Sequence, residues 1–169
     1  MATTTAAYIP VEQYLTSVYR PDREYVDGVV ERRNLGEREH SDVQSNLAAF
    51  FRSRFRQTGI TAWVEWRFRT SPTRFRIPDV MVTLGKPDEK ILSKPPLLCI
   101  EILSPKDRMS RVNARIQEFL QFGVPVVWLI DPTAQRLWIY RPDLSIVEAT
   151  GSVKLDGTSI EVPFSEIFD

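Results

Sequence analysis

The sequence predicts a mixed fold, α/β or α+β, in which helices pack against a central mixed β-sheet. Two segments, residues 37–58 and 108–122, carry apolar residues at helical spacing. Short apolar segments lie between and after them, as is typical of strands buried in a sheet. The resulting order of helix, three strands, helix and further strands is that of a sheet covered by helices.

Length and composition favour a single globular domain over residues 1–169. The chain has 169 residues, of which 43% are hydrophobic and 26% are charged. These proportions exclude a disordered chain, and the length is enough to bury a core. No internal repeat, low-complexity tract or long Gly/Ser linker divides the sequence.

The N-terminal part predicts a short helix, a hairpin and a long helix. Residues 11–18 favour the short helix, and EYVDGVVERR favours two strands around the two-residue turn Asp27-Gly28. The long helix covers residues 37–58, and Gly59 is a stop signal. Its apolar positions are Val43, Leu47, Phe50, Phe51 and Phe55.

Strands and a second helix account for the rest of the chain. Three strands are expected first, at residues 60–69, 75–84 and 96–103. The second helix covers residues 108–122 and ends at Gly123. Its apolar stripe consists of Met109, Val112, Ile116, Phe119 and Leu120. The later strands are expected at residues 125–131, 137–141, 145–148 and 159–162, with a last turn at 164–168.

The net charge is zero, but the charges are unevenly distributed. Lys and Arg number 22, as do Asp and Glu, which excludes a histone-like polycation. Residues 38–76 carry a net charge of +5, whereas residues 116–169 carry −5. Arginine outnumbers lysine by 17 to 5, and arginine forms forked contacts with phosphate. The alternative is a solvated surface with ordinary ion pairs.

Scarce cysteine and histidine exclude several kinds of site. The single Cys99 cannot form a disulfide framework or a cysteine-based zinc site, and it favours a reducing compartment. The single His40 excludes multi-histidine metal sites. No segment reaches the ~18 apolar residues of a membrane span. The start MATTTAAYIP does not have the pattern of a signal peptide, so we expect a cytoplasmic protein.

Two carboxylates occur where apolar residues are expected. Asp79 lies within IPDVMV and Glu101 within LLCIEIL. A carboxylate buried alone is costly, so each must be paired, hydrogen-bonded or metal-bound. Successive strands are often neighbours in a sheet, which would direct both side chains to one place. Such a pair suits Mg²⁺ or Mn²⁺. The alternative is an ion pair for each carboxylate, with Arg76 or Arg115 available.

The motifs around these carboxylates resemble the Uma2-like (DUF820) endonuclease family, within the PD-(D/E)XK nuclease superfamily. Pro78-Asp79 followed by Glu101 resembles the bipartite active-site motif of that superfamily. The more specific matches stand in family order and cover roughly residues 11–140. They are Glu24-Tyr25-Val26-Asp27-Gly28, Glu39-His40, Arg76-Ile77-Pro78-Asp79-Val80, Glu101-Ile102-Leu103-Ser104-Pro105, Phe122-Gly123-Val124 and Trp128-Leu129-Ile130-Asp131-Pro132.

The resemblance implies a restriction-endonuclease-like core that hydrolyses phosphodiester bonds in DNA. It implies a divalent metal, Mg²⁺ or Mn²⁺, held by Asp79, Glu101 and the carbonyl oxygen of Ile102. In the superfamily a lysine stands two residues after the glutamate, where this chain has Leu103. Uma2-like proteins usually carry a lysine on the following helix, at a position that resembles Arg115 here.

Arginine stabilises phosphate charge but cannot act as a general base, because it stays protonated. Three interpretations remain open. The metal-bound water needs no lysine, Lys106 substitutes for it, or the chain is catalytically weak. The alternative function is a catalytically inactive relative that keeps the fold and binds nucleic acid or a protein partner.

Three further residues are candidates for supporting roles around the metal. His40 stands at the family's histidine position, although a histidine that opens a helix is often a surface or capping residue. Asp107 is expected to cap the second helix, with an outer role near the metal as the alternative. Glu24 matches a hairpin acid of the family. A fourth residue, Glu65 on the strand before Asp79, is expected to pair with Arg67 or Arg76, with a place in the metal site as the alternative.

Local basic residues favour DNA as the partner despite the zero net charge, because affinity follows the local patch. The candidate contacts are Arg52, Arg56, Arg74, Arg76, Arg108 and Arg111. Cutting both strands of a duplex is simplest with two active sites, so we expect a two-fold homodimer.

Overall fold

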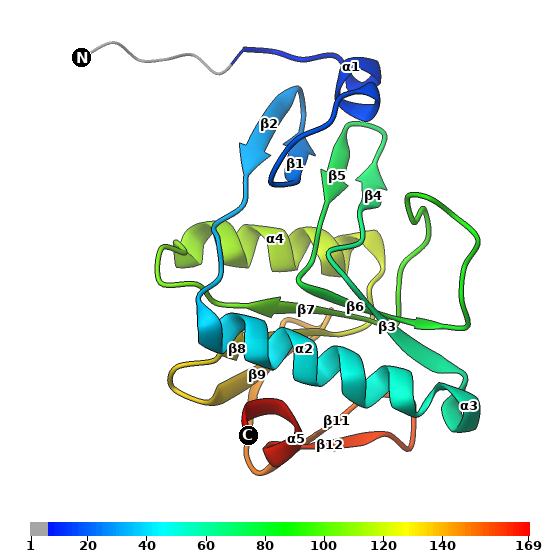
Figure 1. Cartoon of the computed structure of the whole chain (residues 1–169), viewed down its shortest axis with the longest axis vertical. Helices are drawn as coiled ribbons and strands as arrows, with labels where there is room; N and C mark the ends of the chain where they lie inside the picture. The colour runs from blue at the N-terminus through cyan, green and yellow to red at the C-terminus, as the bar shows by residue number, and fades with distance from the viewer. Residues whose placement is uncertain (1–6) are drawn as a thin grey trace.

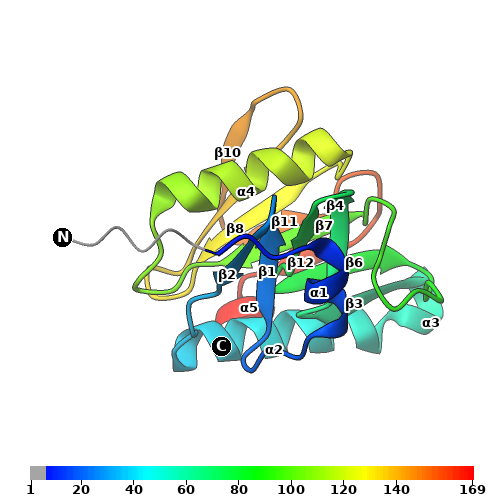
Figure 2. The same ribbon diagram turned by 90° about the horizontal axis from the view of Figure 1, so that it is seen from above.

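The computed structural model describes residues 7–169, so residues 1–6 of the segment MATTTAAYIP lie outside the described residues. A central six-stranded sheet separates two helices, as Figures 1 and 2 show. Its strand order is β10-β9-β8-β7-β6-β3. The parallel pair is β7–β8, and the other neighbours are antiparallel, so the predicted mixed sheet is confirmed. The strands are β3 (Ile60–Val64), β6 (Val80–Leu84), β7 (Leu98–Ile102), β8 (Val127–Asp131), β9 (Arg136–Tyr140) and β10 (Ile146–Ala149).

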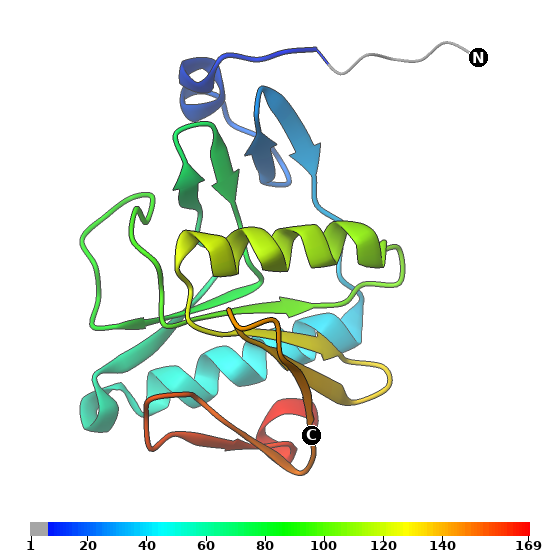
Figure 3. The ribbon, with the colours of Figure 1, turned by 180° about the vertical axis from the view of Figure 1, so that it is seen from behind.

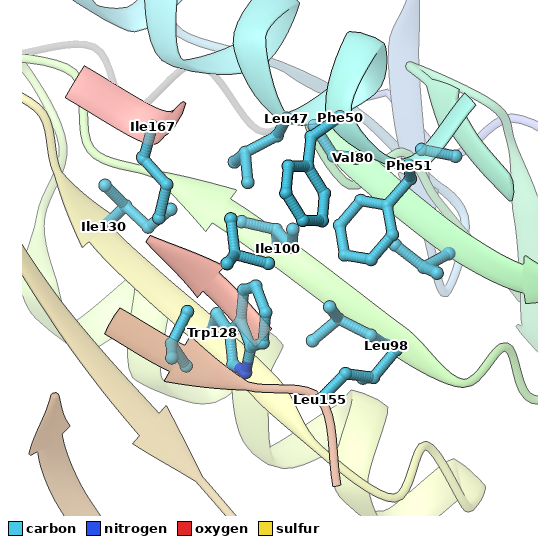
Figure 4. Close-up of a cluster of buried hydrophobic side chains, with 14 of the residues drawn as sticks. Leu47, Phe50, Phe51, Val80, Leu98, Ile100, Trp128, Ile130, Leu155 and Ile167 are labelled. Atoms are coloured by element: carbon cyan, nitrogen blue, oxygen red, sulfur yellow. The ribbon is translucent and has the colours of Figure 1, made fainter. Parts of the chain in front are cut away.

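One face of this sheet packs against α2 (Arg38–Ser53). The apolar stripe of α2 faces side chains that alternate along the strands, because successive residues of a strand point to opposite faces. Figure 4 shows Leu47, Phe50 and Phe51 of α2 against Ile100 and Trp128 of the sheet. The opposite face packs against α4 (Met109–Phe122), whose stripe includes four of the five predicted residues, Val112, Ile116, Phe119 and Leu120.

A second, four-stranded sheet lies at the N-terminal end of the molecule, in the order β2-β1-β5-β4. The hairpin of β1 (Arg23–Val26) and β2 (Val29–Arg32) turns at Asp27-Gly28, as predicted. Both turn residues have positive φ, 49° and 94°, which suits Asp-Gly. The remaining elements are α1 (Val11–Thr16), β4 (Phe68–Ser71) and β5 (Arg74–Arg76). The rings of Tyr14, Tyr25 and Phe75 form the core of this part.

The structure corrects two predicted strands. The segment 60–69 breaks at Glu65, whose φ is +51°, and gives β3 to the central sheet and β4 to the N-terminal sheet. The segment 75–84 breaks over Ile77-Pro78-Asp79 and gives β5 and β6 to different sheets. Asp79 therefore precedes a strand instead of lying within one. Apolar residues alternate with polar ones across the first break, and the second interrupts a mostly apolar segment, so periodicity alone could not locate either break.

Smaller differences occur at helix ends and near the C-terminus. The helix expected over 37–58 breaks at Arg54 into α2 and α3 (Phe55–Thr58), and Phe55 is only half-buried. Gly59 and Gly123 end α3 and α4 in the left-handed conformation, as predicted. The C-terminal part forms β11 (Ser152–Lys154), which was not predicted, β12 (Glu161–Pro163) and α5 (Ser165–Phe168), at the end of the molecule away from α1 (Figure 3).

No helix in the described residues, 7–169, has the length and apolar character needed to cross a membrane.

Candidate active site

Asp79 and Glu101 lie at the end of the β6–β7 pair and line the same cavity, so the two carboxylates come to one place as the sequence predicts. The antiparallel register of β6 and β7 pairs Val80 with Ile100 and Met81 with Cys99. Continuing this register by one residue places Asp79 opposite Glu101. Residues directly opposite one another share a face of the sheet. The shared face is the one that α4 covers, because Met81 and Cys99 pack against α4.

The carboxylate of Asp79 is buried and fully engaged. Its Oδ2 accepts a hydrogen bond from the backbone N–H of Ile102 at 2.8 Å. Its Oδ1 lies 2.7 Å from a guanidinium nitrogen of Arg33 and 3.5 Å from Nε2 of His40. Burial alone would raise the pKa of Asp79, but the contacts with His40 and Arg33 lower it below its ordinary value. The carboxylate is therefore ionised and firmly held.

Glu101 is in a different environment, although it is equally buried. Its Oε2 lies 2.6 Å from a guanidinium nitrogen of Arg115 on α4. Its Oε1 is buried and has no hydrogen-bond partner within residues 7–169. Burial raises the pKa of Glu101 to about 7, because the charge of Arg115 offsets only part of the desolvation and Asp79 and Glu24 add repulsion. The site thus holds one carboxylate that stays charged, Asp79, and one with a pKa of about 7, Glu101.

His40 links Asp79 to the turn that follows β7. Its Nδ1 lies 3.4 Å from the hydroxyl oxygen of Ser104, and its Nε2 faces Asp79. The contact with Asp79 outweighs burial and raises the pKa of His40. Gly36 lies directly against this ring: a Cβ at position 36 would be 2.6 Å from the imidazole. The absence of a side chain at residue 36 is therefore needed for the position of His40.

Asp107 does not cap α4, which corrects the prediction. The N-cap residue is Arg108, and no side chain caps the helix. Oδ2 of Asp107 instead accepts the backbone N–H of Ser104 at 2.7 Å, and Oδ1 accepts the amide of Asn34 at 2.7 Å. Asp107 therefore closes the turn after β7 and ties it to the connection between β2 and α2.

Sequence reasoning missed Arg33, which follows β2 directly. Its guanidinium binds Asp79 and also lies 3.3 Å from Glu65. Glu65 therefore pairs with Arg33, instead of Arg67 or Arg76 as predicted. Arg32 is exposed and Arg33 is half-buried, but the two are adjacent and chemically alike, so their residue types do not show which one faces the site.

A second buried ion cluster borders the site. The Arg76 guanidinium donates to Glu24 at 2.9 Å and to Glu118 at 2.6 Å. Glu24 also accepts the backbone N–H of Ile77. The Nε of Arg115 lies 3.6 Å from Glu24, so the two clusters touch. Arg76 is 7% exposed and turned toward these carboxylates, not toward the surface.

The basic residues of the sequence prediction separate into three groups. Lys106, Arg108 and Arg111 line a cavity of about 450 Å³ together with Asp79 and Glu101. Arg74 and Arg76 are held by carboxylates: Arg74 pairs with Asp27 and Glu118, and Arg76 with Glu24 and Glu118. The others, Arg52 and Arg56, are exposed at the far end of α2 and in α3. Helical rise places Arg52 roughly 18 Å along α2 from His40.

The oxygen donors of this cavity suit a hard divalent cation. Asp79 and Glu101 contribute carboxylates on one face of the sheet, and Oε1 of Glu101 has a lone pair that no group in residues 7–169 uses. Carboxylate and carbonyl oxygens are the ligands that Mg²⁺ and Mn²⁺ prefer. Within the described part of the chain, no group of three or more His, Cys, Asp or Glu side chains is arranged to hold a metal ion. Any such ion would therefore depend on these two carboxylates, main-chain oxygen and water.

The mixed sheet, its two flanking helices and the carboxylates at the meeting point of β6 and β7 define a restriction-endonuclease-like fold. The family model Uma2, described as "Putative restriction endonuclease", matches residues 11–163, and the chain belongs to this family.

A solved structure shares the fold. The crystal structure of a "putative nuclease belonging to DUF820" from Anabaena variabilis superimposes with a TM-score of 0.80 and 24% sequence identity. The match covers 95% of this chain and 97% of that one. None of the curated proteins matches this chain.

Proposed function

We propose that the protein is a metal-dependent endonuclease that hydrolyses phosphodiester bonds in DNA. The observation that carries this proposal is that the buried carboxylates of Asp79 and Glu101 line one cavity, with Oε1 of Glu101 unpartnered among the described residues. Membership of a family described as restriction endonucleases supports it.

Asp79, Glu101 and the carbonyl oxygen of Ile102 would hold Mg²⁺ or Mn²⁺. When bound, such an ion lowers the pKa of a coordinated water and neutralises charge on the scissile phosphate. Asp79 is oriented for this task by the N–H of Ile102 and by His40. These contacts fix the carboxylate before any ligand arrives, which reduces the cost of ordering it.

Arg115 and Lys106 supply positive charge where the phosphate would lie. Arg115 is held by Glu101, and its pKa is raised further by that carboxylate, so it remains a cation. It can stabilise negative charge that develops on phosphate oxygens, but it cannot accept a proton. Lys106 is exposed at the rim of the same cavity and is the second candidate for this role.

The rim of the cavity would bind DNA outside the scissile phosphate. Arg108, the N-cap residue of α4, and Arg111, on its first turn, are exposed at the edge of the cavity. Arg52 and Arg56 would extend the basic surface along α2 and α3. Arg74 and Arg76 are less suited to DNA, because their guanidinium groups already bind carboxylates.

Cutting both strands of a duplex would use two copies of this site, so we also propose a two-fold homodimer in the cytoplasm. Sedimentation equilibrium with and without a short DNA duplex tests this assembly. A monomer under both conditions would contradict it.

The ion pairs of the site favour one alternative function. Arg33 and Arg115 give each carboxylate a structural partner, so both acids would stabilise the fold even in a protein without activity. The alternative is a catalytically inactive relative that binds nucleic acid or a protein partner.

Metal binding and cleavage, measured together, separate the two functions. Wild-type protein and Glu101→Gln are titrated with Mn²⁺ by calorimetry and then incubated with supercoiled plasmid. The glutamine keeps an acceptor for Arg115, so the variant is expected to stay folded while losing metal affinity and nicking. Binding without nicking supports the inactive relative, and a wild type that binds no Mn²⁺ at millimolar concentration contradicts the metal site.

A further inference from the structure

Arg33 lies between two carboxylates that differ in burial. One guanidinium nitrogen is 2.7 Å from Oδ1 of Asp79, and the other is 3.3 Å from Oε1 of Glu65. The side chain of Asp79 is 9% exposed, whereas that of Glu65 is 51% exposed. Arg33 thus reaches the surface through Glu65 and the centre of the site through Asp79.

The chain holds Glu65 in this position through an unusual backbone conformation. Glu65 follows β3 directly with a φ of +51°, in the left-handed region that residues other than glycine rarely adopt. Its backbone N–H donates to the carbonyl oxygen of Asp79 at 3.3 Å. The main chain therefore holds the backbones of the two acceptor residues next to each other, so both carboxylates stay within reach of Arg33.

Arg33 also lies between two cavities. It lines the cavity of about 450 Å³ on the side of Glu101 and a smaller one of about 180 Å³ on the side of Glu65. Asp79 and His40 line both. In both cavities, therefore, the carboxylate of Asp79 is accompanied by the guanidinium that contacts its Oδ1.

We propose that Arg33 is a positioning residue that competes with the divalent cation for Asp79 and moves onto Glu65 when the cation binds. This inference rests on the proposed function, since it concerns the same metal site. Two positive charges cannot share Oδ1 at short distance without strong repulsion. A guanidinium with a second carboxylate within reach can withdraw from Asp79 without becoming an unpaired buried charge.

Arg115 does not have the same freedom. Its second carboxylate, Glu24, is 1% exposed and already binds Arg76 and the backbone N–H of Ile77. Glu65, by contrast, forms no other ion pair among residues 7–169. Movement of Arg33 therefore leaves the rest of the ion network intact.

The test measures Mn²⁺ affinity by calorimetry for wild type, Arg33→Gln, Glu65→Gln and the double variant. Removing a competing charge-assisted contact should tighten Mn²⁺ binding about tenfold in Arg33→Gln. Glu65→Gln should weaken binding several-fold, because Arg33 then stays on Asp79. Adding Glu65→Gln to Arg33→Gln should change the affinity little, because no guanidinium remains to be accommodated. Damage to the fold cannot produce the gain in affinity.

Arg32→Gln is the matched control. It removes the same charge one residue away, from an exposed side chain at the cavity rim, and should change the affinity less than about twofold because solvent screens that charge.

An equal gain in Mn²⁺ affinity in Arg32→Gln and Arg33→Gln would mean that the loss of any nearby positive charge has this effect, and it would overturn the inference. So would a Glu65→Gln effect of the same size in both backgrounds, or an unchanged affinity in Arg33→Gln. Absence of Mn²⁺ binding in wild type and in Arg33→Gln alike would instead overturn the proposed metal site, and this inference with it.

Discussion

Two buried ion clusters lie side by side beneath α4, and they differ in how completely their polar atoms are paired. In the Arg76 cluster, all three guanidinium nitrogens donate to carboxylates, and both oxygens of Glu24 accept hydrogen bonds. In the Glu101 cluster, Oε1 of Glu101 and Nε of Arg115 are buried without a hydrogen-bond partner in the described residues. A fully paired cluster stabilises the fold, whereas an incompletely paired one has capacity left for a ligand.

The Arg76 cluster should give the largest effect on stability. Arg76→Met leaves Glu24 and Glu118 without their main partner in a buried place, and we expect a decrease of about 3–5 kcal/mol in the free energy of unfolding. Urea denaturation measures it. Arg74→Met is the control, because that partly exposed side chain should cost at most about 1 kcal/mol. Equal decreases in the two variants would contradict a structural role specific to Arg76.

The Glu101 cluster should make the free energy of unfolding depend on pH. The pKa of Glu101 in the folded protein, about 7, lies above its ordinary value. The folded state therefore binds a proton that the unfolded chain releases, and this stability is lost as the pH rises through about 7. With a chelator present, wild type should lose about 2–3 kcal/mol more than Glu101→Gln between pH 5 and pH 8.5. Parallel pH profiles for the two proteins would contradict the raised pKa.

The link between the site and the β2–α2 connection should give an intermediate effect. A methyl group in Gly36→Ala would overlap the ring of His40, and we expect a decrease of about 1 kcal/mol in the free energy of unfolding. Displacing the ring from Asp79 should also lower the pKa of His40, since that contact raises it. Because His40 is the single histidine of the sequence, one NMR titration measures the change. An unchanged pKa would mean that the ring keeps its place.

The exposed arginines of α4 should contribute to DNA affinity and not to stability. Arg108→Gln together with Arg111→Gln should leave the free energy of unfolding unchanged within about 0.5 kcal/mol. It should weaken binding of a DNA duplex and reduce the salt dependence of the affinity by about one unit for each phosphate that is no longer neutralised. The double change at Arg52 and Arg56, farther from the carboxylates, should have a smaller effect. A larger loss of DNA affinity from the Arg52 and Arg56 changes would indicate that DNA binds mainly along α2.

Much of the fold could be predicted from the sequence, because periodicity and turn residues are local signals. The turn at Asp27-Gly28 and the end of α4 at Gly123 were confirmed, as were the apolar stripes of α2 and α4 except for Phe55 and Met109. The breaks at Glu65 and at residues 77–79 could not be predicted, because each segment resembles one continuous strand although its two pieces pair in different sheets.

The candidate site was predictable in part for the same reason. Asp79 and Glu101 attract notice because charged residues interrupt apolar segments. Arg33 lies in an ordinary polar connection, and only the three-dimensional path of the chain brings it to Asp79. Both carboxylates also form buried ion pairs that can stabilise the fold, so their presence in apolar segments does not by itself indicate activity.

The chain passes between its N-terminal sheet and the layers of the central sheet at three places: residues 33–37, 65–67 and 77–79. Each passage contributes one member of the same ion-paired group, namely Arg33, Glu65 and Asp79. The ion pairs of this group therefore link the two sheets through side chains as well as through the main chain. Because Arg33 follows β2 and Glu65 follows β3, their ion pair would keep the two sheets connected even when a cation takes the place of Arg33 on Asp79.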